Sequence, residues 1–307
     1  MATTVTPFAF RIPATTANLG PGFGVLGLAL DLWLEFGVTP TEGPMAVTRI
    51  DTPSEVTRDL RHDPVARGIR AAAERFDIKV PPGLSIDVRG DVPRGCGLGT
   101  NTAELAAGIQ LACRLAKEAP ALDDRLTLLV SIGGDPAHGG AALRGGLTAS
   151  VPCHRHPHED IWRILALPLS PIWRFVIVAP DVALGTADVH RVVPASVPNT
   201  VSQRTAGRIV GLIEALAHGD PELLAECLHD ETHVPFRMQL APGMPSAAAA
   251  GRAAGAAGVT ISGHGPALVA FAAGDPDARR IADAMAEAFA QHGITSRSEV
   301  VRAAPAL

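Results

Sequence analysis

The sequence PRGCGLGTNTAE, residues 93–104, carries most of the information about the fold. Apolar residues alternate over 84–88, as in a half-buried strand, and a helical pattern follows over 102–116. Between them, Gly95, Gly97 and Gly99 permit backbone conformations that leave N–H groups free to face an anion. The first turn of the helix adds unpaired N–H groups and the positive end of its dipole. Such a loop could hold a triphosphate, although an ordinary glycine-rich turn would have the same features.

The loop belongs to neither of two common nucleotide-binding types. No Gly-Lys-[Ser/Thr] follows the glycines, as it would in a Walker loop. The GxGxxG turn of dinucleotide-binding folds would be expected earlier in the chain. The sequence therefore indicates a different family of phosphate loop.

Composition limits the function classes that remain. The chain has 307 residues, of which 47% are hydrophobic, so it can form two compact domains that share an interface. Its net charge is −5 and its charges are scattered, which argues against nucleic acid as a partner. Residues 12–30 are uncharged, but two prolines and four glycines interrupt them, so we expect no membrane span. Four widely spaced cysteines fit reduced thiols in the cytoplasm.

The order of predicted elements divides the chain in two. Strand patterns over 8–12, 34–38 and 84–88 are interleaved with helical patterns over 65–76, 102–116 and 126–132. After a boundary at 167–171 the order becomes a strand, three helices, two strands, a helix and a strand. We predict an α/β protein with a mixed N-terminal domain over 1–168. The C-terminal domain, over 169–307, should hold an antiparallel sheet with helices on one face.

Three other segments show a resemblance to a known family. Residues 11–30, RIPATTANLGPGFGVLGLAL, resemble the VPASSANLGPGFDxLGLAL opening of homoserine kinases. Residues 93–104 resemble their PxGxGLGSSAA motif, 230–237 (DETHVPFR) a DxxHxPYR element, and 261–268 (ISGHGPAL) an SGAGPT motif. All four occur in the family's order and spacing. The chain is therefore identified as a member of the GHMP kinase superfamily, closest in pattern to homoserine kinase.

The resemblance implies a two-domain fold with ATP between the halves and Mg²⁺ on its phosphates. It implies ATP-dependent phosphorylation of the hydroxyl of a small amino acid, homoserine or a relative, and a homodimer would be common for the family. The residues expected to bind nucleotide are Arg94, Gly95, Gly97, Leu98, Gly99, Thr100, Asn101, Thr102, Gly263 and Gly265. Those expected at the substrate are Asn18, Gly24, His190, Arg191 and Arg237.

The sequence departs from the family on the substrate and metal side. Gly24 stands where homoserine kinases carry an Asp for the substrate ammonium, and loss of that contact is worth about 1.5–3 kcal/mol. We therefore expect L-homoserine to be a poor substrate. Residues 133–141 align with EGHPDNVAP, which leaves no acid for Mg²⁺ at position 133 or in 126–132. In this alignment His becomes Asp135 and Asn becomes His138.

These replacements suggest other roles. His138 could accept a hydroxyl proton near neutral pH, with Asp135 orienting its ring or binding metal. Thr100 and Glu104 could hold Mg²⁺, although Glu104 would also suit a helix N-terminus through the dipole alone. His138 and Asp135 could equally be polar loop residues without chemistry.

Three function classes remain open at this point. The glycine loop and Arg237 favour a kinase. The missing acid before Gly133 favours a GHMP relative of non-kinase chemistry or an inactive ligand-binding paralogue.

Overall fold

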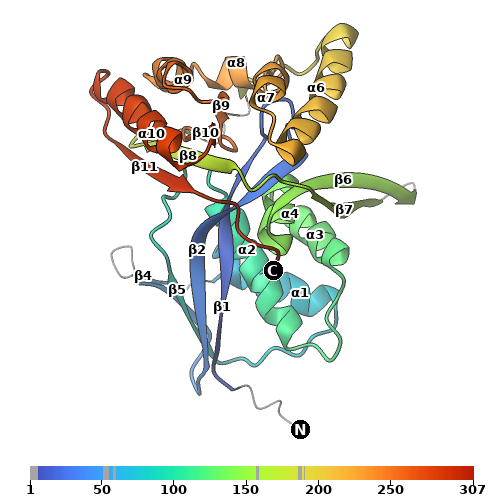
Figure 1. The fold of residues 1–307 in the computed structure, drawn as a ribbon. Helices are drawn as coiled ribbons and strands as arrows, with labels where there is room; N and C mark the ends of the chain where they lie inside the picture. The colour runs from blue at the N-terminus through green and yellow to red at the C-terminus, as the bar shows by residue number, and fades with distance from the viewer. Residues whose placement is uncertain (1–5, 51–54, 58–59, 157–158, 186–188, 190) are drawn as a thin grey trace.

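The computed structural model describes residues 6–50, 55–57, 60–156, 159–185, 189 and 191–307. Within them the chain forms two sheets, one above the other in Figure 1. The seven-stranded sheet has the order β4-β3-β5-β2-β6-β7, with β1 paired to β2, and only β3 and β5 run parallel. Its strands are β1 Phe8–Ala17, β2 Leu26–Pro40, β3 Ala46–Arg49, β4 Glu55–Thr57, β5 Leu84–Arg89, β6 Leu147–His156 and β7 Glu159–Leu167.

Four helices accompany the seven-stranded sheet, and α1 packs on α2. They are α1 Pro64–Arg75, α2 Thr100–Arg114, α3 Leu122–Ser131 and α4 Pro136–Arg144. Asp63 caps α1 by accepting a hydrogen bond from the backbone N–H of Ala66 at 3.1 Å. Glycines let α1 approach α2 closely, since a Cβ on Gly68 would lie 2.3 Å from the carbonyl oxygen of Leu105. The position of α2, and of the glycine loop before it, is therefore set by close packing.

The second sheet is antiparallel, with the strand order β11-β8-β10-β9. Its strands are β8 Trp173–Pro180, β9 Gly258–Ile261, β10 Leu268–Ala273 and β11 Ser296–Val301. The accompanying helices are α6 Asn199–His218, α7 Pro221–Cys227, α8 Val234–Arg237, α9 Met244–Ala253 and α10 Asp275–Ala290. α9 and α10 form an apolar layer with one face of the sheet, through residues such as Val176, Ala247 and Met285. This arrangement confirms the predicted fold class.

The structure differs from the sequence prediction in some elements. The segment around His138, interpreted as a loop, is the helix α4, which begins at Pro136 after the cap Asp135. The hairpin of β6 and β7 was not predicted, because Pro152 and several charged and histidine residues interrupt its strand pattern. Among the described residues, no helix has the length and apolarity to cross a membrane.

The end of the described chain returns to the first sheet. The N–H of Asp31 donates to the carbonyl of Arg302, and the N–H of Ala304 donates to that of Ala29, each at 2.9 Å. The sheets change between Leu167 and Trp173, close to the predicted boundary. The division at residue 169 remains a prediction, and residues 302–304 contact the first sheet.

Candidate active site

The glycine loop opens into a cavity of about 320 Å³ at the start of α2, which we call the phosphate cavity after the phosphates that the loop is predicted to hold. Gly95, Gly97 and Gly99 have φ angles of +69°, +98° and +66°, values that residues other than glycine rarely adopt. Gly99 provides no side-chain cap, so the first N–H groups of α2 stay available to an anion. The cavity is lined by Gly95, Gly97, Gly99, Thr100, Asn101, Thr102, Gly133, Asp135, His138, Leu184, Val189, His264 and Gly265.

Ser262, in the 261–268 motif, joins that motif to the glycine loop and to the 11–30 motif. Its Oγ lies 2.8 Å from the carbonyl oxygen of Gly97 and 2.9 Å from Oγ1 of Thr16. A Cβ on Gly97 would lie only 2.0 Å from the carbonyl oxygen of Ser262. Only glycine fits at position 97, because the two loops are in direct backbone contact.

Backbone hydrogen bonds also join motifs that are far apart in the sequence. Thr15 N–H donates to the carbonyl of Leu98 at 3.1 Å, and Gly263 N–H donates to that of Ala17 at 2.9 Å. Leu98 is buried in the core, and neither Leu98, Gly263 nor Arg94 lines the phosphate cavity. For Leu98 and Gly263 the structure therefore shows a structural contact, and their nucleotide contacts remain predictions.

His138 is held by Thr15, a residue that the sequence did not single out. Its ring Nδ1 lies 2.7 Å from Oγ1 of Thr15. Asp135 instead accepts a hydrogen bond at 2.9 Å from the backbone N–H of His138, as the cap of α4. The predicted orientation of the ring by Asp135 is therefore corrected, because Thr15 makes the ring's hydrogen bond. Two consecutive threonines at the end of an apolar strand, Thr15 and Thr16, were the available signal.

The imidazole of His138 is buried between two glycines. A Cβ on Gly99 or on Gly263 would come within 2.5 Å of a ring nitrogen. Burial lowers the pKa of His138, and the nearby charge of Asp135 opposes this effect only in part. The ring is therefore neutral near pH 7 and can accept a proton.

Arg237 places a buried guanidinium beside the phosphate cavity, with both terminal nitrogens unpaired among the described residues. The residue is 1% exposed, and its Nη1 and Nη2 atoms have no hydrogen-bond partner among the described residues. Its Nε donates a long bond, at 3.4 Å, to the carbonyl of Val189, which lines the cavity. Burial lowers the pKa of Arg237, while the charges of Asp135 and Asp230 act in the opposite direction. A buried cation without a partner is costly, which points to an anionic ligand.

The first turn of α8 fixes the position of Arg237. Asp230 accepts hydrogen bonds from the N–H groups of His233 at 2.7 Å and Val234 at 2.8 Å. Burial would raise the pKa of Asp230, but the charge of His233 and these hydrogen bonds outweigh it and lower the pKa. The His233 ring stacks on Phe23, whose ring lies 4.9 Å from Cζ of Arg237. The DxxHxPYR-like element thus positions the guanidinium.

Asn18 and Gly24 meet in the first motif. Asn18 accepts a hydrogen bond from Gly24 N–H at 2.7 Å, and its Nδ2 donates to the carbonyl of Gly263 at 3.1 Å. Apart from their chain neighbours, no described residue has an atom within 4 Å of the position that a Cβ of Gly24 or of Gly133 would take. Two of the positions where the family motifs carry an acid therefore border open space among the described residues.

Glu104, a predicted metal ligand, forms ion pairs with two arginine side chains. Its buried carboxylate forms a 2.8 Å ion pair with Arg49 and a second ion pair with Arg94. Arg49 also pairs with Asp63 at 2.9 Å. Burial acts to lower the pKa of Arg49, but the contacts with Glu104 and Asp63 raise it overall. Coordination of Mg²⁺ by Glu104 would require these pairs to break.

The cavity fits Mg²⁺ only as an ion carried by phosphates. The described residues contain no group of three His, Cys, Asp or Glu side chains placed to hold a metal. Asp135 is the one carboxylate that lines the described cavity, beside the hydroxyls of Thr100 and Thr102. Mg²⁺ in kinases is bound through one or two carboxylates together with substrate phosphates, so this donor set is sufficient.

Two further residues were predicted at the substrate, and a second space adjoins the cavity. Arg191 is exposed, and His190 lies outside the described residues. A second cavity of about 620 Å³ shares Gly95 and Leu184 with the phosphate cavity. The site therefore continues beyond the glycine loop into a larger space.

Comparison with known proteins identifies the family. Residues 65–146 match the GHMP kinases N terminal domain, and residues 212–291 match GHMP kinases C terminal. Homoserine kinase of Moorella thermoacetica is 33% identical over 284 residues, which cover 92% of this chain and 93% of that relative. The chain belongs to the homoserine kinase family. It is a small-molecule kinase of the GHMP superfamily.

A second relative agrees with this assignment, and two solved structures have the same fold. Homoserine kinase of Gloeobacter violaceus is 35% identical over 85% of this chain and 86% of its own length. The crystal structure of homoserine kinase from Cytophaga hutchinsonii has a TM-score of 0.84 at 24% identity, and covers 99% of this chain and 97% of its own. Methanococcus jannaschii mevalonate kinase has the same fold, with a TM-score of 0.70 at 14% identity, and covers 98% of this chain and 99% of its own.

Proposed function

We propose that the protein transfers a phosphoryl group from ATP to the hydroxyl of a small amino acid. A pair of opposite charges beside the phosphate cavity, Arg237 and Asp135, carries this proposal. The terminal nitrogens of Arg237 have no partner among the described residues, and no ion pair joins the two groups there. An amino acid offers a carboxylate to the guanidinium and an ammonium to the aspartate. A zwitterion would therefore satisfy both groups at once.

The glycine loop and α2 would receive the phosphates of ATP, through the free N–H groups after Gly99. His138 would accept the proton of the acceptor hydroxyl. If its Nδ1–H donates to Thr15, Nε2 keeps the lone pair that proton transfer requires. The protein would thus act mainly by positioning the reactants and stabilising charge, as is usual in phosphoryl transfer.

Magnesium would neutralise charge on the phosphates when it is bound. Thr100 would supply a hydroxyl ligand from the first turn of α2. Glu104 remains a predicted ligand, although its ion pairs with Arg49 and Arg94 oppose that role. Asp135 is the other carboxylate available, so its role as ammonium or metal ligand has to be tested directly.

The relatives named homoserine kinase make L-homoserine the first substrate to assay. Because Gly24 replaces the family's Asp, the acid comes from Asp135, on a different element. We propose that the preference has moved from L-homoserine toward another small hydroxy-amino acid. We further propose a cytoplasmic location, which the free thiols of its cysteines support, and a homodimer as in the family.

A panel of L-homoserine, L-threonine and L-serine, assayed by ADP release, tests the reaction. Asp135→Asn should raise KM for the preferred amino acid about 10- to 100-fold, the loss of one charge-assisted contact. Its Mg²⁺ activation curve should stay unchanged. Asp283→Asn, at an exposed aspartate of α10, is the matched control.

A weaker response to Mg²⁺ with an unchanged KM for the amino acid would identify Asp135 as a metal ligand. If Asp135→Asn weakens Mg²⁺ activation and leaves KM for the amino acid unchanged, the zwitterion proposal fails. Absence of ADP release with every amino acid, together with absence of nucleotide binding by calorimetry, would contradict the kinase reaction itself.

A further inference from the structure

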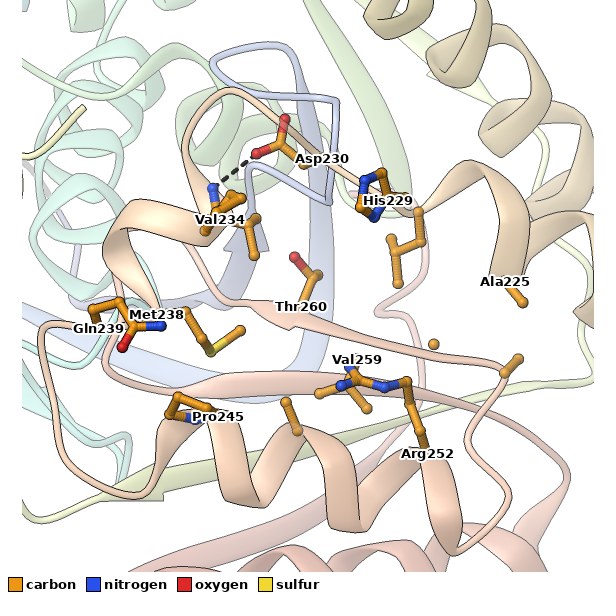
Figure 2. A pocket seen from close by; sticks show the side chains of 15 residues that line it. Ala225, His229, Asp230, Val234, Met238, Gln239, Pro245, Arg252, Val259 and Thr260 are labelled. Atoms are coloured by element: carbon orange, nitrogen blue, oxygen red, sulfur yellow. Dashed lines mark hydrogen bonds between the residues drawn. The ribbon is translucent and has the colours of Figure 1, made fainter. Parts of the chain in front are cut away.

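A separate cavity of about 460 Å³ lies in the C-terminal half, bounded by the segments α7 to α9 and by the strand β9 (Figure 2). It shares no lining residue with the phosphate cavity. Its size falls within the range of about 300–1,000 Å³ that is typical of small-molecule sites. The kinase reaction described above makes no use of it.

Thr260 gives this cavity an unsatisfied polar group. The residue is 1% exposed, and its Oγ1 has no hydrogen-bond partner among the described residues. Figure 2 shows its hydroxyl directed into the cavity, toward the loop that holds Asp230 and Val234. A buried hydroxyl without a partner is unfavourable, so a ligand atom that bonds to it would be stabilised.

The free edge of β9 adds backbone groups to the same wall. β9 pairs only with β10 among the described strands, so its other edge forms no hydrogen bonds with a neighbouring described strand. The bond from Ser262 N–H to the carbonyl of Ala267, at 2.8 Å, marks a hydrogen-bonded pair in the register of these strands. Because such pairs alternate, the backbone groups of Val259 face away from β10. Val259 lines the cavity and can offer it both a donor and an acceptor.

The remaining wall combines the cation of Arg252 with apolar side chains and with the polar side chains of His229 and Gln239. The exposed Arg252 extends from α9 across to Val259, as Figure 2 shows, and forms no ion pair with a described residue. Val234, Met238 and Ala248 supply apolar surface. A guanidinium at the mouth and an apolar interior suit an aliphatic molecule with an anionic end.

A carboxylate suits this site better than a phosphate. The one acid in the lining, Asp230, already accepts four hydrogen bonds from Thr232, His233 and Val234, and its charge would repel a dianion. Arg252 provides a single guanidinium, which matches the two oxygens of a carboxylate. The cavity therefore selects a singly charged, largely apolar molecule.

The walls of this cavity lead directly to the kinase site. Val234 and Met238 line it, while Arg237, on the same helical turn, reaches the phosphate cavity side. β9 continues from Thr260 into Ser262, which contacts the glycine loop. A ligand that orders this wall would therefore act on both α8 and the 261–268 motif.

We propose that this cavity binds a small aliphatic carboxylate that regulates the kinase site through α8. Binding can be measured without ATP or substrate, so its outcome is independent of the proposed reaction. The regulatory part rests on the proposed function, since it is read from KM for the amino acid.

Calorimetry on the full chain tests binding with 4-methylpentanoate and L-leucine as probes. Each should bind at one site, and 4-methylpentanamide and acetate should bind far more weakly, because they lack the charge or the apolar body. Stronger binding of L-leucine would identify amino acids as the natural source, and stronger binding of 4-methylpentanoate would identify simple carboxylic acids. Absence of binding by both probes up to about 10 mM would overturn the proposal.

Two variants locate the bound probe. Arg252→Gln should weaken it about 10- to 100-fold, and Thr260→Val up to about tenfold, as expected for charged and neutral hydrogen bonds. Thr260→Val keeps the side-chain shape and removes a buried orphan hydroxyl, so it should fold normally. Arg279→Gln, at an exposed arginine of α10, is the control. Unchanged affinity in both Arg252→Gln and Thr260→Val would overturn the site.

Saturating 4-methylpentanoate should change KM for the amino acid substrate by about fivefold or more, the lower range of measured coupling. By reciprocity, the probe should change the dissociation constant of the amino acid, and the amino acid that of the probe, by one and the same factor, which calorimetry measures for both. Binding of the probe with an unchanged KM would overturn the regulatory part.

Discussion

The imidazole Nδ1 of His138 lies 2.7 Å from the hydroxyl oxygen of Thr15, a residue 123 positions earlier in the chain. Both side chains are buried, and the ring also lies against Gly99 of the 93–104 motif and Gly263 of the 261–268 motif. Three of the four family motifs therefore meet around one histidine. Substitutions at this contact can separate the role of the ring from the integrity of the junction.

The isosteric change Thr15→Val removes the hydrogen bond and keeps the packing. We expect kcat to fall about tenfold, because the ring loses its fixed orientation, with KM for ATP unchanged. His138→Ala should lower kcat by about 10²–10⁴-fold if the ring is the base. Steady-state kinetics and the pH profile of kcat measure both effects. Thr41→Val, at an exposed threonine, is the control, and full activity of His138→Ala would show that the ring has no chemical role.

Two buried histidines should make stability depend on pH. Burial lowers the pKa of His138 and of His233 in the folded protein. The unfolded chain, with a histidine pKa of about 6.5, then binds more protons below that pH. The free energy of unfolding should therefore fall as pH drops below about 6.5, by up to about 1.4 kcal/mol per pH unit for each group.

Urea denaturation between pH 7.5 and 5.5 measures this slope. His138→Gln should reduce it, whereas His218→Gln, at an exposed histidine, should leave it unchanged. Equal slopes in all three proteins would contradict neutral burial of His138.

Gly24→Asp should restore the acid that the family carries. No atom obstructs a Cβ at this position, and aspartate tolerates its φ of +71° better than most residues. We expect kcat/KM for L-homoserine to rise about 10- to 100-fold, the value of one charge-assisted contact. Gly24→Asn, of the same shape without charge, is the control. An equal gain in both variants would show that charge at position 24 does not set the preference.

Glu104→Gln tests whether this residue is structural or binds metal. Removal of the charge leaves Arg49 and Arg94 without their shared partner, and breaking a buried pair costs about 3–5 kcal/mol. We expect a lower melting temperature and an unchanged Mg²⁺ activation curve. A stable variant with weakened Mg²⁺ activation would instead support the metal role.

Gly97→Val and Gly95→Val should have different effects on nucleotide binding. At Gly97 the new side chain collides with the carbonyl of Ser262, so stability and ADP affinity should both be lost. At Gly95 no atom lies within 4 Å of a Cβ, and only its φ of +69° is unfavourable. Calorimetry with ADP should show weak binding by a folded Gly95→Val protein. Retained ADP affinity in that protein would place the phosphates elsewhere.

Local patterns predicted the glycine loop, α2 and most elements of the C-terminal half. These segments have strong periodicity and clear turn residues. The helix α4 was missed because it is short and carries consecutive glycines, Gly139 and Gly140, which disfavour a helix. Gly140 is nevertheless helical because it packs against Ser150 of β6, where a Cβ would collide with the hydroxyl. Tertiary packing overrides the local preference there.

The candidate site was predicted as a set of residues, but not as a set of contacts. A sequence cannot show that Glu104 is neutralised by Arg49 or that the Arg237 guanidinium lacks a partner, because both depend on distant elements. It also cannot show that Thr15 reaches His138. These relations arise only when the two sheets meet.

The chain crosses between the sheets twice, once after Leu167 and again after Val301. The contacts of Ser262 with Gly97 and of Gly263 with Ala17 add a third region of attachment, at the site itself. A rigid body attached at two points can rotate only about the line through them, and a third point off that line removes this freedom too. The two halves are therefore held in a fixed relative orientation. A hinge motion that separated them at the site would have to break the contact between Ser262 and Gly97. We expect ligands to enter and leave the site through movements of side chains and surface loops, while the two sheets keep their relative positions.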